Sequence, residues 1–270
     1  MQISENTPKK ILSGAVVLIF FIMISQHYWS EKKKQEQRPN RTDVAMETVR
    51  VPILTYHSIR PYYPNETTFV KEFDVPPDVF EQQLDYLIKQ GYTAISFRAL
   101  IDHFKNGRPL PAKPVILSFD DGWKNQYEYA FPILQKKKLI ATFFVFTNAI
   151  GHKKYLSWDQ VVALDAAGMT IGSHTEFHPY LFKMTDHAAL WKEIAESKEI
   201  IESHLHKPTY VFAYPFGLYN DENISVVKEA GYEAARSTRR GWVHTKDDLF
   251  TLKSIQAATS LSGFIRDLNQ

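Results

Sequence analysis

The sequence predicts an α/β protein in which a parallel sheet closes into a barrel of seven or eight strand–helix units. Short apolar or β-branched runs alternate with helical patterns at spacings of about 20–40 residues, which is typical of a parallel sheet. The alternation occupies residues 51–270, close to the roughly 200–250 residues that a (β/α) barrel uses. No internal repeat or second domain is visible, so one domain is expected, with an open doubly wound sheet as the alternative.

The first half of the chain supplies four predicted strands. A strand leads to His57, and the helix that begins at Pro77 repeats apolar residues at helical spacing until Gly91 stops it. A later helical segment contains Pro132, which kinks or splits it. The last strand of this half is rich in β-branched and aromatic residues. The expected strands are 51–56, 93–96, 115–119 and 140–147, and the expected helices are 77–88, 99–104 and 124–138.

The second half continues the alternation with clearer helix boundaries. Ser157 is a good N-cap residue, and Gly168 closes the helix that follows it. Gly231 ends a second helix in the same way. The expected strands are 169–172, 210–213, 232–235 and 249–255, and the expected helices are 158–167, 186–205 and 221–230.

The N-terminal region predicts a membrane anchor. Residues 11–24 carry no charge, and residues 11–29 are just long enough to span a bilayer, with Tyr28 and Trp29 at the interface. A cleaved signal peptide is the alternative, but no small-x-small site follows the apolar run. We expect an anchor at 1–30 and a polar linker at 31–50. The expected location is the cell membrane with the domain outside the cytoplasm, or secretion if the segment is cleaved.

Composition limits the possible partners and metal ligands. The formal charge is only +2, so no strongly basic surface predicts a nucleic-acid partner. The chain has no cysteine, which excludes disulfides and thiolate metal sites. Any metal must therefore be held by histidine and carboxylate side chains.

The segment 114–123, PVILSFDDGW, combines a buried strand with adjacent acids. The run up to Phe119 is apolar, and Asp120, Asp121 and Gly122 follow it directly. Two carboxylates at the mouth of a buried strand are costly unless a cation, a shared proton or solvent compensates for their lost hydration. Taken alone, the motif is more typical of an ordinary turn.

The segment 172–181, GSHTEFHPYL, changes that balance. His174 and His178 are four residues apart, and on a short helical turn both imidazoles would face one ion. Pro179 prevents a long helix here. The C-terminal strand ends of a barrel meet at one face, so these histidines, His57 and the acidic pair are expected to converge there. Two histidines and one carboxylate leave metal positions open for water and substrate.

Three motifs resemble those of the polysaccharide deacetylases of carbohydrate esterase family four. They are Ser118-Phe119-Asp120-Asp121-Gly122, Ser173-His174-Thr175-x-x-His178-Pro179, and Ala213-Tyr214-Pro215-Phe216-Gly217. The resemblance covers roughly residues 51–260 and implies a distorted (β/α) barrel. It implies that Asp121, His174 and His178 hold a divalent ion, usually zinc. It further implies that Asp120 is the catalytic base and that the main-chain N–H near Phe216 helps to hold the oxyanion.

Two features of the family pattern are missing. The arginine of the third motif is Ala213 here, and the C-terminal Leu-x-His motif that supplies the catalytic acid is absent. His57, in Thr55-Tyr56-His57-Ser58, is the candidate acid. A Tyr-His at the first strand end resembles the subgroup that deacetylates poly-N-acetylglucosamine in biofilm matrix, which also commonly lacks that arginine.

The expected function is metal-dependent removal of N-acetyl groups from an N-acetylhexosamine polysaccharide. Poly-N-acetylglucosamine is the favoured polymer, and peptidoglycan or a chitin oligomer is the alternative for the same chemistry. A non-catalytic carbohydrate-binding protein on a degenerate barrel is the rival from another class. The protein is expected to be a monomer.

Overall fold

The computed structural model describes residues 48–63 and 72–269. The predicted anchor at 1–30 and nearly all of the predicted linker lie outside the described residues. Within the described ranges, every helix is too short or too polar to cross a bilayer.

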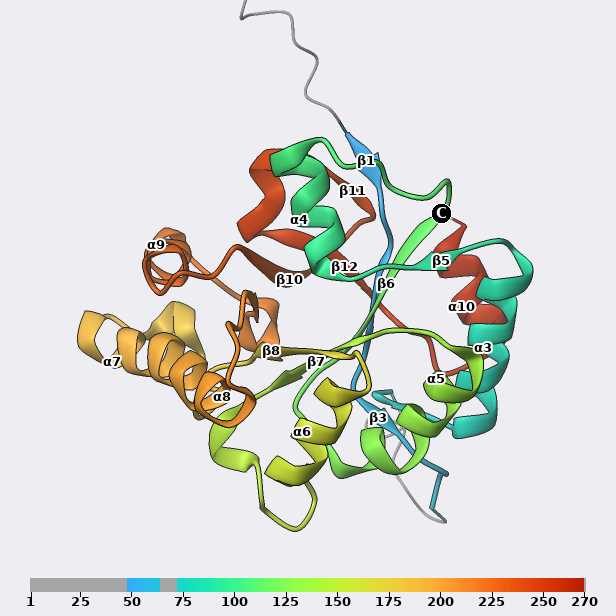
Figure 1. Ribbon diagram of the computed structural model, residues 1–270, viewed down its shortest axis with the longest axis horizontal. Coiled ribbons are helices and arrows are strands. Elements are labelled where there is room, and N and C mark those ends of the chain that lie inside the picture. The colour runs from blue at the N-terminus through green and yellow to red at the C-terminus, as the bar shows by residue number, and fades with distance from the viewer. Residues whose placement is uncertain (1–47, 64–71, 270) are drawn as a thin grey trace, which may run out of the picture. The chain divides into compact units, whose positions relative to one another are not determined.

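The centre of the fold is a closed barrel of parallel strands (Figure 1). Around the barrel the order is β2 (Ile53–Tyr56), β6 (Pro114–Phe119), β7 (Thr142–Val145), β8 (Thr170–Ser173), β9 (Val211–Ala213), β10 (Ala234–Arg240) and β12 (Leu252–Gln256). Both β6 and β12 pair with β2, which closes the ring. The short β5 (Thr93–Ala94) pairs only with the start of β6. The predicted α/β barrel is confirmed, with seven strands in the ring.

The helices lie outside the ring and mostly match the expected segments (Figure 1). They are α3 (Pro77–Lys89), α4 (Phe97–Asn106), α5 (Phe131–Lys137), α6 (Trp158–Ala166), α7 (His187–Trp191), α8 (Ser197–Leu205), α9 (Asp221–Glu229) and α10 (Leu261–Leu268). Two expected long helices are each interrupted by a π-helical turn, η1 (Gln126–Ala130) and η4 (Lys192–Glu196). Pro132 sits in the first turn of α5, directly after η1, as its effect on helices predicts.

Several short elements were not expected from the sequence. They are α10 and two small ribbons, β1 (Val49–Arg50) with β11 (Val243–His244), and β3 (Ser58–Ile59) with β4 (Asp74–Val75). The final strand begins at Leu252 because residues 246–250 form a 3₁₀ helix capped by Thr245. Pairs of two residues depend on contacts between distant segments, so local sequence carries little signal for them.

Side chains along each strand alternate between the barrel interior and the surrounding helices. Ile53 and Ile116 belong to an apolar cluster inside the ring, against which α4 packs, whereas Leu54 and Leu117 lie in the larger cluster under the helices. A Cβ on Gly172 would lie 2.6 Å from the Phe144 ring, so the interior has no room for a side chain there. The same alternation decides which polar residues face inward at the carboxyl ends of the strands.

Candidate active site

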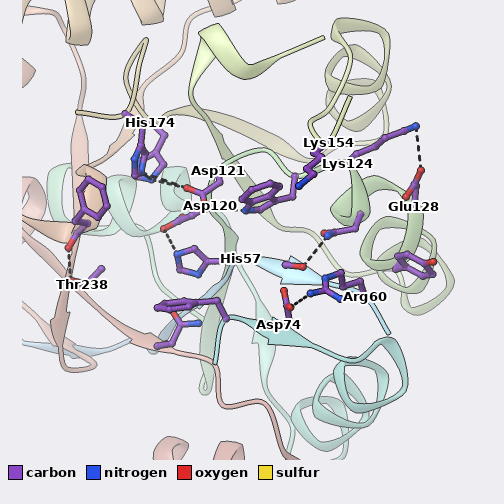
Figure 2. Close-up of a pocket in the computed structure, with 18 of the residues that line it drawn as sticks. His57, Arg60, Asp74, Asp120, Asp121, Lys124, Glu128, Lys154, His174 and Thr238 are labelled. Atoms are coloured by element: carbon purple, nitrogen blue, oxygen red, sulfur yellow. Dashed lines mark hydrogen bonds and ion pairs between the residues drawn. The ribbon is translucent and has the colours of Figure 1, made fainter. Parts of the chain in front are cut away.

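Polar side chains replace apolar ones at the carboxyl end of the barrel interior. Two residues beyond the inward-facing Ile53 and Ile116 are Thr55 and Ser118, whose hydroxyls lie 3.5 Å apart. Two residues further along the same strands are His57 and Asp120. This parity places both predicted catalytic side chains on the inner face, where they line a cavity of about 1320 Å³ (Figure 2).

The three predicted metal ligands converge at this mouth. The Oδ1 atom of Asp121 lies 3.7 Å from Nε2 of His174 and 3.5 Å from Nε2 of His178. The two Nε2 atoms are 3.2 Å apart. Nδ1 of His174 lies 2.7 Å from the carbonyl oxygen of Ala213 and donates to it, which leaves Nε2 with its lone pair available. One carboxylate oxygen and two imidazole nitrogens at these separations fit a divalent metal ion.

Burial also favours the neutral imidazoles that a metal requires. Desolvation lowers the pKa of His174 to about 4, against the opposing effect of Asp120. Desolvation likewise lowers the pKa of His178. Neutral histidine is the form that binds a metal, so these two imidazoles need not release a proton when a metal binds near neutral pH.

The predicted helical turn between the two histidines is wrong. Residues 174–180 form a loop in which Thr175 and His178 have positive φ values of 72° and 59°. The His178 N–H donates to Oγ1 of Thr175 at 2.9 Å, which closes a local turn. A left-handed backbone is uncommon for residues other than glycine, so contacts outside the loop must hold it.

Glu193, on the π-helical turn η4, supplies such contacts. Its Oε2 accepts hydrogen bonds from the N–H groups of Glu176 at 3.2 Å and Phe177 at 2.9 Å. The side chain is buried, and desolvation raises its pKa. Sequence reasoning missed this residue, because an acid in a helix 15 residues after His178 carries no motif.

Arg236 provides Asp120 with an arginine partner that the third motif lacks. It is fully buried on β10, and its Nη2 donates to Oδ1 and Oδ2 of Asp120 at 2.6 and 2.5 Å. Arg236 is the register partner of Ala213 on the neighbouring strand β9, so the guanidinium reaches the acid from one strand further round. The predicted strand 232–235 stopped one residue short of it. An arginine directly after two alanines at the end of a predicted strand was the feature of the sequence that could have identified this residue.

Asp120 is therefore an ionised buried acid. Burial by itself raises the pKa of a carboxyl group, but the charges of Arg236, His174 and His57 outweigh it. The net effect is a pKa for Asp120 below its usual value. A carboxylate held ionised can accept a proton throughout the neutral pH range.

His57 lies on the other side of Asp120 from His174 (Figure 2). Its Nε2 is 3.9 Å from Oδ2 of Asp120, and its ring packs edge-on against Phe73 at 5.2 Å. Nδ1 of His57 is buried and has no hydrogen-bond partner among the described residues. The side chain is 20% exposed, so it can reach a molecule in the cavity.

Phe216 lies on a tight turn at the rim of the cavity. It has φ 57° within the 3₁₀ turn Pro215–Gly217, and its ring stacks on Tyr180 at 4.0 Å. Within the described part of the chain, its N–H makes no hydrogen bond and remains a free donor. Gly217 follows with φ 69°, and a Cβ there would lie 2.3 Å from the backbone nitrogen of Thr238. The turn therefore requires glycine.

Comparisons with known proteins point to one family. The family model for polysaccharide deacetylase matches residues 107–235, which include all three motifs. The solved structure of BA0330 from Bacillus anthracis is also similar to this chain, with 30% sequence identity and a TM-score of 0.71. The match covers 82% of this chain and 69% of that chain. The chain belongs to the polysaccharide deacetylase family. Members of this family are metal-dependent hydrolases that act on polysaccharide N-acetyl groups.

Two other relatives connect this deacetylase domain to named proteins. The structure of the Streptococcus pyogenes deacetylase PplD in complex with acetate is 29% identical, with a TM-score of 0.77 over 82% of this chain and 99% of that chain. The poly-beta-1,6-N-acetyl-D-glucosamine N-deacetylase of Staphylococcus aureus (strain MRSA252) is 26% identical over 199 residues. That match covers 66% of this chain and 68% of the relative.

Proposed function

We propose that this deacetylase domain is a metal-dependent N-deacetylase of an N-acetylglucosamine-containing surface polysaccharide. One observation carries the proposal: the convergence of Asp121, His174 and His178 beside the ionised Asp120, inside a large open cavity. A binding protein has no need of an ionised acid next to a metal site, whereas amide hydrolysis requires a base at that position.

The three convergent side chains would hold the ion. A divalent metal bound there would supply Lewis acidity toward the attacking water and the amide carbonyl, and zinc suits two imidazoles and one carboxylate. Trp123 donates from Nε1 to Oδ2 of Asp121 at 3.0 Å, which leaves Oδ1 directed at the histidines. This hydrogen bond fixes the carboxylate orientation before any ion binds.

The remaining groups would move protons and hold charge. Asp120 accepts a proton from the attacking water, and Arg236 keeps the acid ionised until that step. His57, on the opposite side of Asp120, donates a proton to the departing amine. The free N–H of Phe216 donates to the oxygen on which negative charge develops.

The polymer and the cellular location remain part of the proposal. The name of the Staphylococcus aureus relative supports poly-N-acetylglucosamine as substrate, with peptidoglycan and chitin oligomers as alternatives for the same chemistry. The uncharged run at residues 11–24 supports tethering at the membrane with the domain outside the cytoplasm.

Acetate release by the full-length protein tests the proposal. The wild type should release acetate from at least one of the three polymers and stop when a chelator is added. Asp121→Ala should lose bound metal, whereas Asp120→Asn should keep the metal and lose activity. Asp247→Asn, an exposed acid in the other Asp-Asp pair, is the matched control and should behave as wild type. Full activity in Asp120→Asn would exclude the proposed base.

The rival function, carbohydrate binding without turnover, was suggested by the missing arginine and the missing acid motif. Arg236 supplies an arginine to Asp120 from another strand, and His57 offers an acid from the front of the domain. Both observations weaken the case for a degenerate site. Polymer binding without acetate release at any metal loading would favour the rival.

A further inference from the structure

One end of the cavity carries positive charge that the proposed reaction does not use. Lys124, Lys153 and Lys154 line the cavity together with the catalytic residues. Figure 2 shows Lys124 and Lys154 at one end and Thr238 at the other, with Asp121 between them. The volume of about 1320 Å³ exceeds that of typical small-ligand sites, about 300–1,000 Å³, so the cavity can hold more than the reacting sugar. We call these three lysines the lysine arm.

The charge of the lysine arm is largely uncompensated. Lys124 lies 3.5 Å from Glu128, but both side chains are nearly half exposed, so this ion pair is weak. Within residues 48–63 and 72–269, Lys153 and Lys154 are exposed and neither forms an ion pair with a carboxylate. The other cation on this side of the cavity, Arg60, is paired with Asp74. The lining of the cavity therefore includes at least two lysines without a carboxylate partner among the described residues.

The lysine arm is tied to the metal site through the backbone. The N–H of Lys124 donates to the carbonyl of Lys154 at 2.9 Å, and Trp123 forms a β-bridge with Tyr155. The rings of Trp123 and Tyr155 stack at 4.6 Å. Trp123 also donates to Asp121, a predicted metal ligand. The backbone that carries the arm is thus anchored beside the reacting centre, as a substrate-positioning element requires.

The lysine arm can distinguish substrates by their charge, because deacetylation itself creates positive charge on the polymer. Each acetyl group removed leaves an amine that is partly protonated at neutral pH, so a neutral polymer gains positive charge as the reaction proceeds. Ammonium groups in the cavity repel such a product and attract an oxyanion. Lysine is a suitable point charge for carboxylate or phosphate.

We infer that the substrate carries an anionic group, a carboxylate or a phosphate, close to the acetamido sugar, and that the lysine arm binds it. The inference rests on the proposed deacetylase function and narrows it. Among the candidate polymers it places an anionic glycan such as peptidoglycan ahead of neutral poly-N-acetylglucosamine.

Matched oligosaccharides test the inference in two independent assays. Acetate release and equilibrium binding are measured with neutral N-acetylglucosamine oligomers, with oligomers containing N-acetylmuramic acid, and with oligomers bearing glycerol phosphate. The wild type should prefer a charged oligomer, and the preference should weaken as salt is raised. In the variant K153Q/K154Q the ratio of charged to neutral kcat/KM should fall about tenfold, since two ion pairs are lost. Comparison of the two charged oligomers identifies carboxylate or phosphate as the group recognised.

The control variant K89Q/K136Q removes the same charge from the exposed faces of α3 and α5, outside the cavity, and should keep the wild-type preference. The inference is overturned if the wild type has equal kcat/KM and equal affinity for neutral and charged oligomers, or if K153Q/K154Q keeps the wild-type preference. Either result leaves the proposed function intact. Absence of acetate release from every oligomer contradicts the proposed function instead. The binding measurements then still support or overturn the charge preference by themselves.

Discussion

Replacing Arg236 by methionine would remove the guanidinium that faces Asp120 and keep a side chain of similar length. Arg236 is fully buried, and the Asp120 side chain is only 3% exposed, so solvent can replace little of the lost interaction. The Nε atom of Arg236 has no partner among the described residues, and its Nη1 contacts are long, 3.4 and 3.5 Å. Asp120 is therefore the main partner of the arginine, and each residue depends on the other.

The size of the effect follows from this mutual dependence. Removing one partner of a buried ion pair costs about 3–5 kcal/mol, because the remaining charge is left in a medium of low dielectric constant. We expect Arg236→Met to lower the free energy of unfolding by about this amount. Asp120→Asn should cost less, since the amide oxygen can still accept from Arg236. The double variant leaves neither charge of this pair buried. Its loss in free energy of unfolding should therefore be smaller than the sum of the two single losses, by about 2 kcal/mol or more.

Urea unfolding of the four proteins with chelator present measures the coupling without a contribution from bound metal. The pair lowers the pKa of Asp120, so its stabilisation is present above the ordinary aspartate range and is lost as the pH falls through the folded-state pKa. The wild type should consequently lose more stability than Arg236→Met on acidification to about pH 3. Additive effects within about 0.5 kcal/mol would refute the reasoning, because they would mean that the two side chains do not interact in solution.

Three further predictions concern Glu193, His244 and Gly217. Glu193→Ala should weaken metal binding about 10–100-fold in a titration. Glu193→Gln, which can still accept hydrogen bonds from the same N–H groups, and the exposed control Glu196→Ala should bind metal as the wild type does. Equal metal affinities of Glu193→Ala and the wild type would exclude the positioning role. Burial lowers the pKa of His244 from 6.5 to about 4, so its contribution to stability is present above pH 6.5 and is lost as the pH falls toward 4. His244→Gln should therefore flatten the dependence of the free energy of unfolding on pH between these values. An unchanged slope would contradict this. Gly217→Ala should lower the melting temperature and the acetate release together, because its Cβ would meet the backbone of Thr238; wild-type values for both would show that the turn can relax.

The acids and histidines could be placed at strand ends from the sequence for a simple physical reason. Asp120 and His174 each follow directly on a buried strand, so the apolar run that predicts the strand also predicts where the side chain emerges. Parallel strands bring such ends together irrespective of their separation in the chain. The convergence of these groups with His57 could therefore be predicted from local patterns.

Local patterns failed where the conformation depends on a contact from elsewhere. The loop between His174 and His178 is held open by Glu193, and its left-handed residues are not encoded by glycine. The spacing of four residues was compatible with a helical turn and equally with this loop. His244, which has no apparent partner in the sequence, is buried and hydrogen-bonded to the carbonyl of Val51.

The sequence by itself determined the alternation of strands and helices of an α/β protein and the identity of the acids and histidines that follow the strands, because these depend on residues adjacent in the chain. Only the tertiary structure decided that seven strands close the ring and that Arg236 is the partner of Asp120. Those two residues are 116 positions apart, and they meet only because β10 pairs in register with β9 and the ring closes through β2. Strand register and closure are properties of the whole packed barrel, which no local segment specifies.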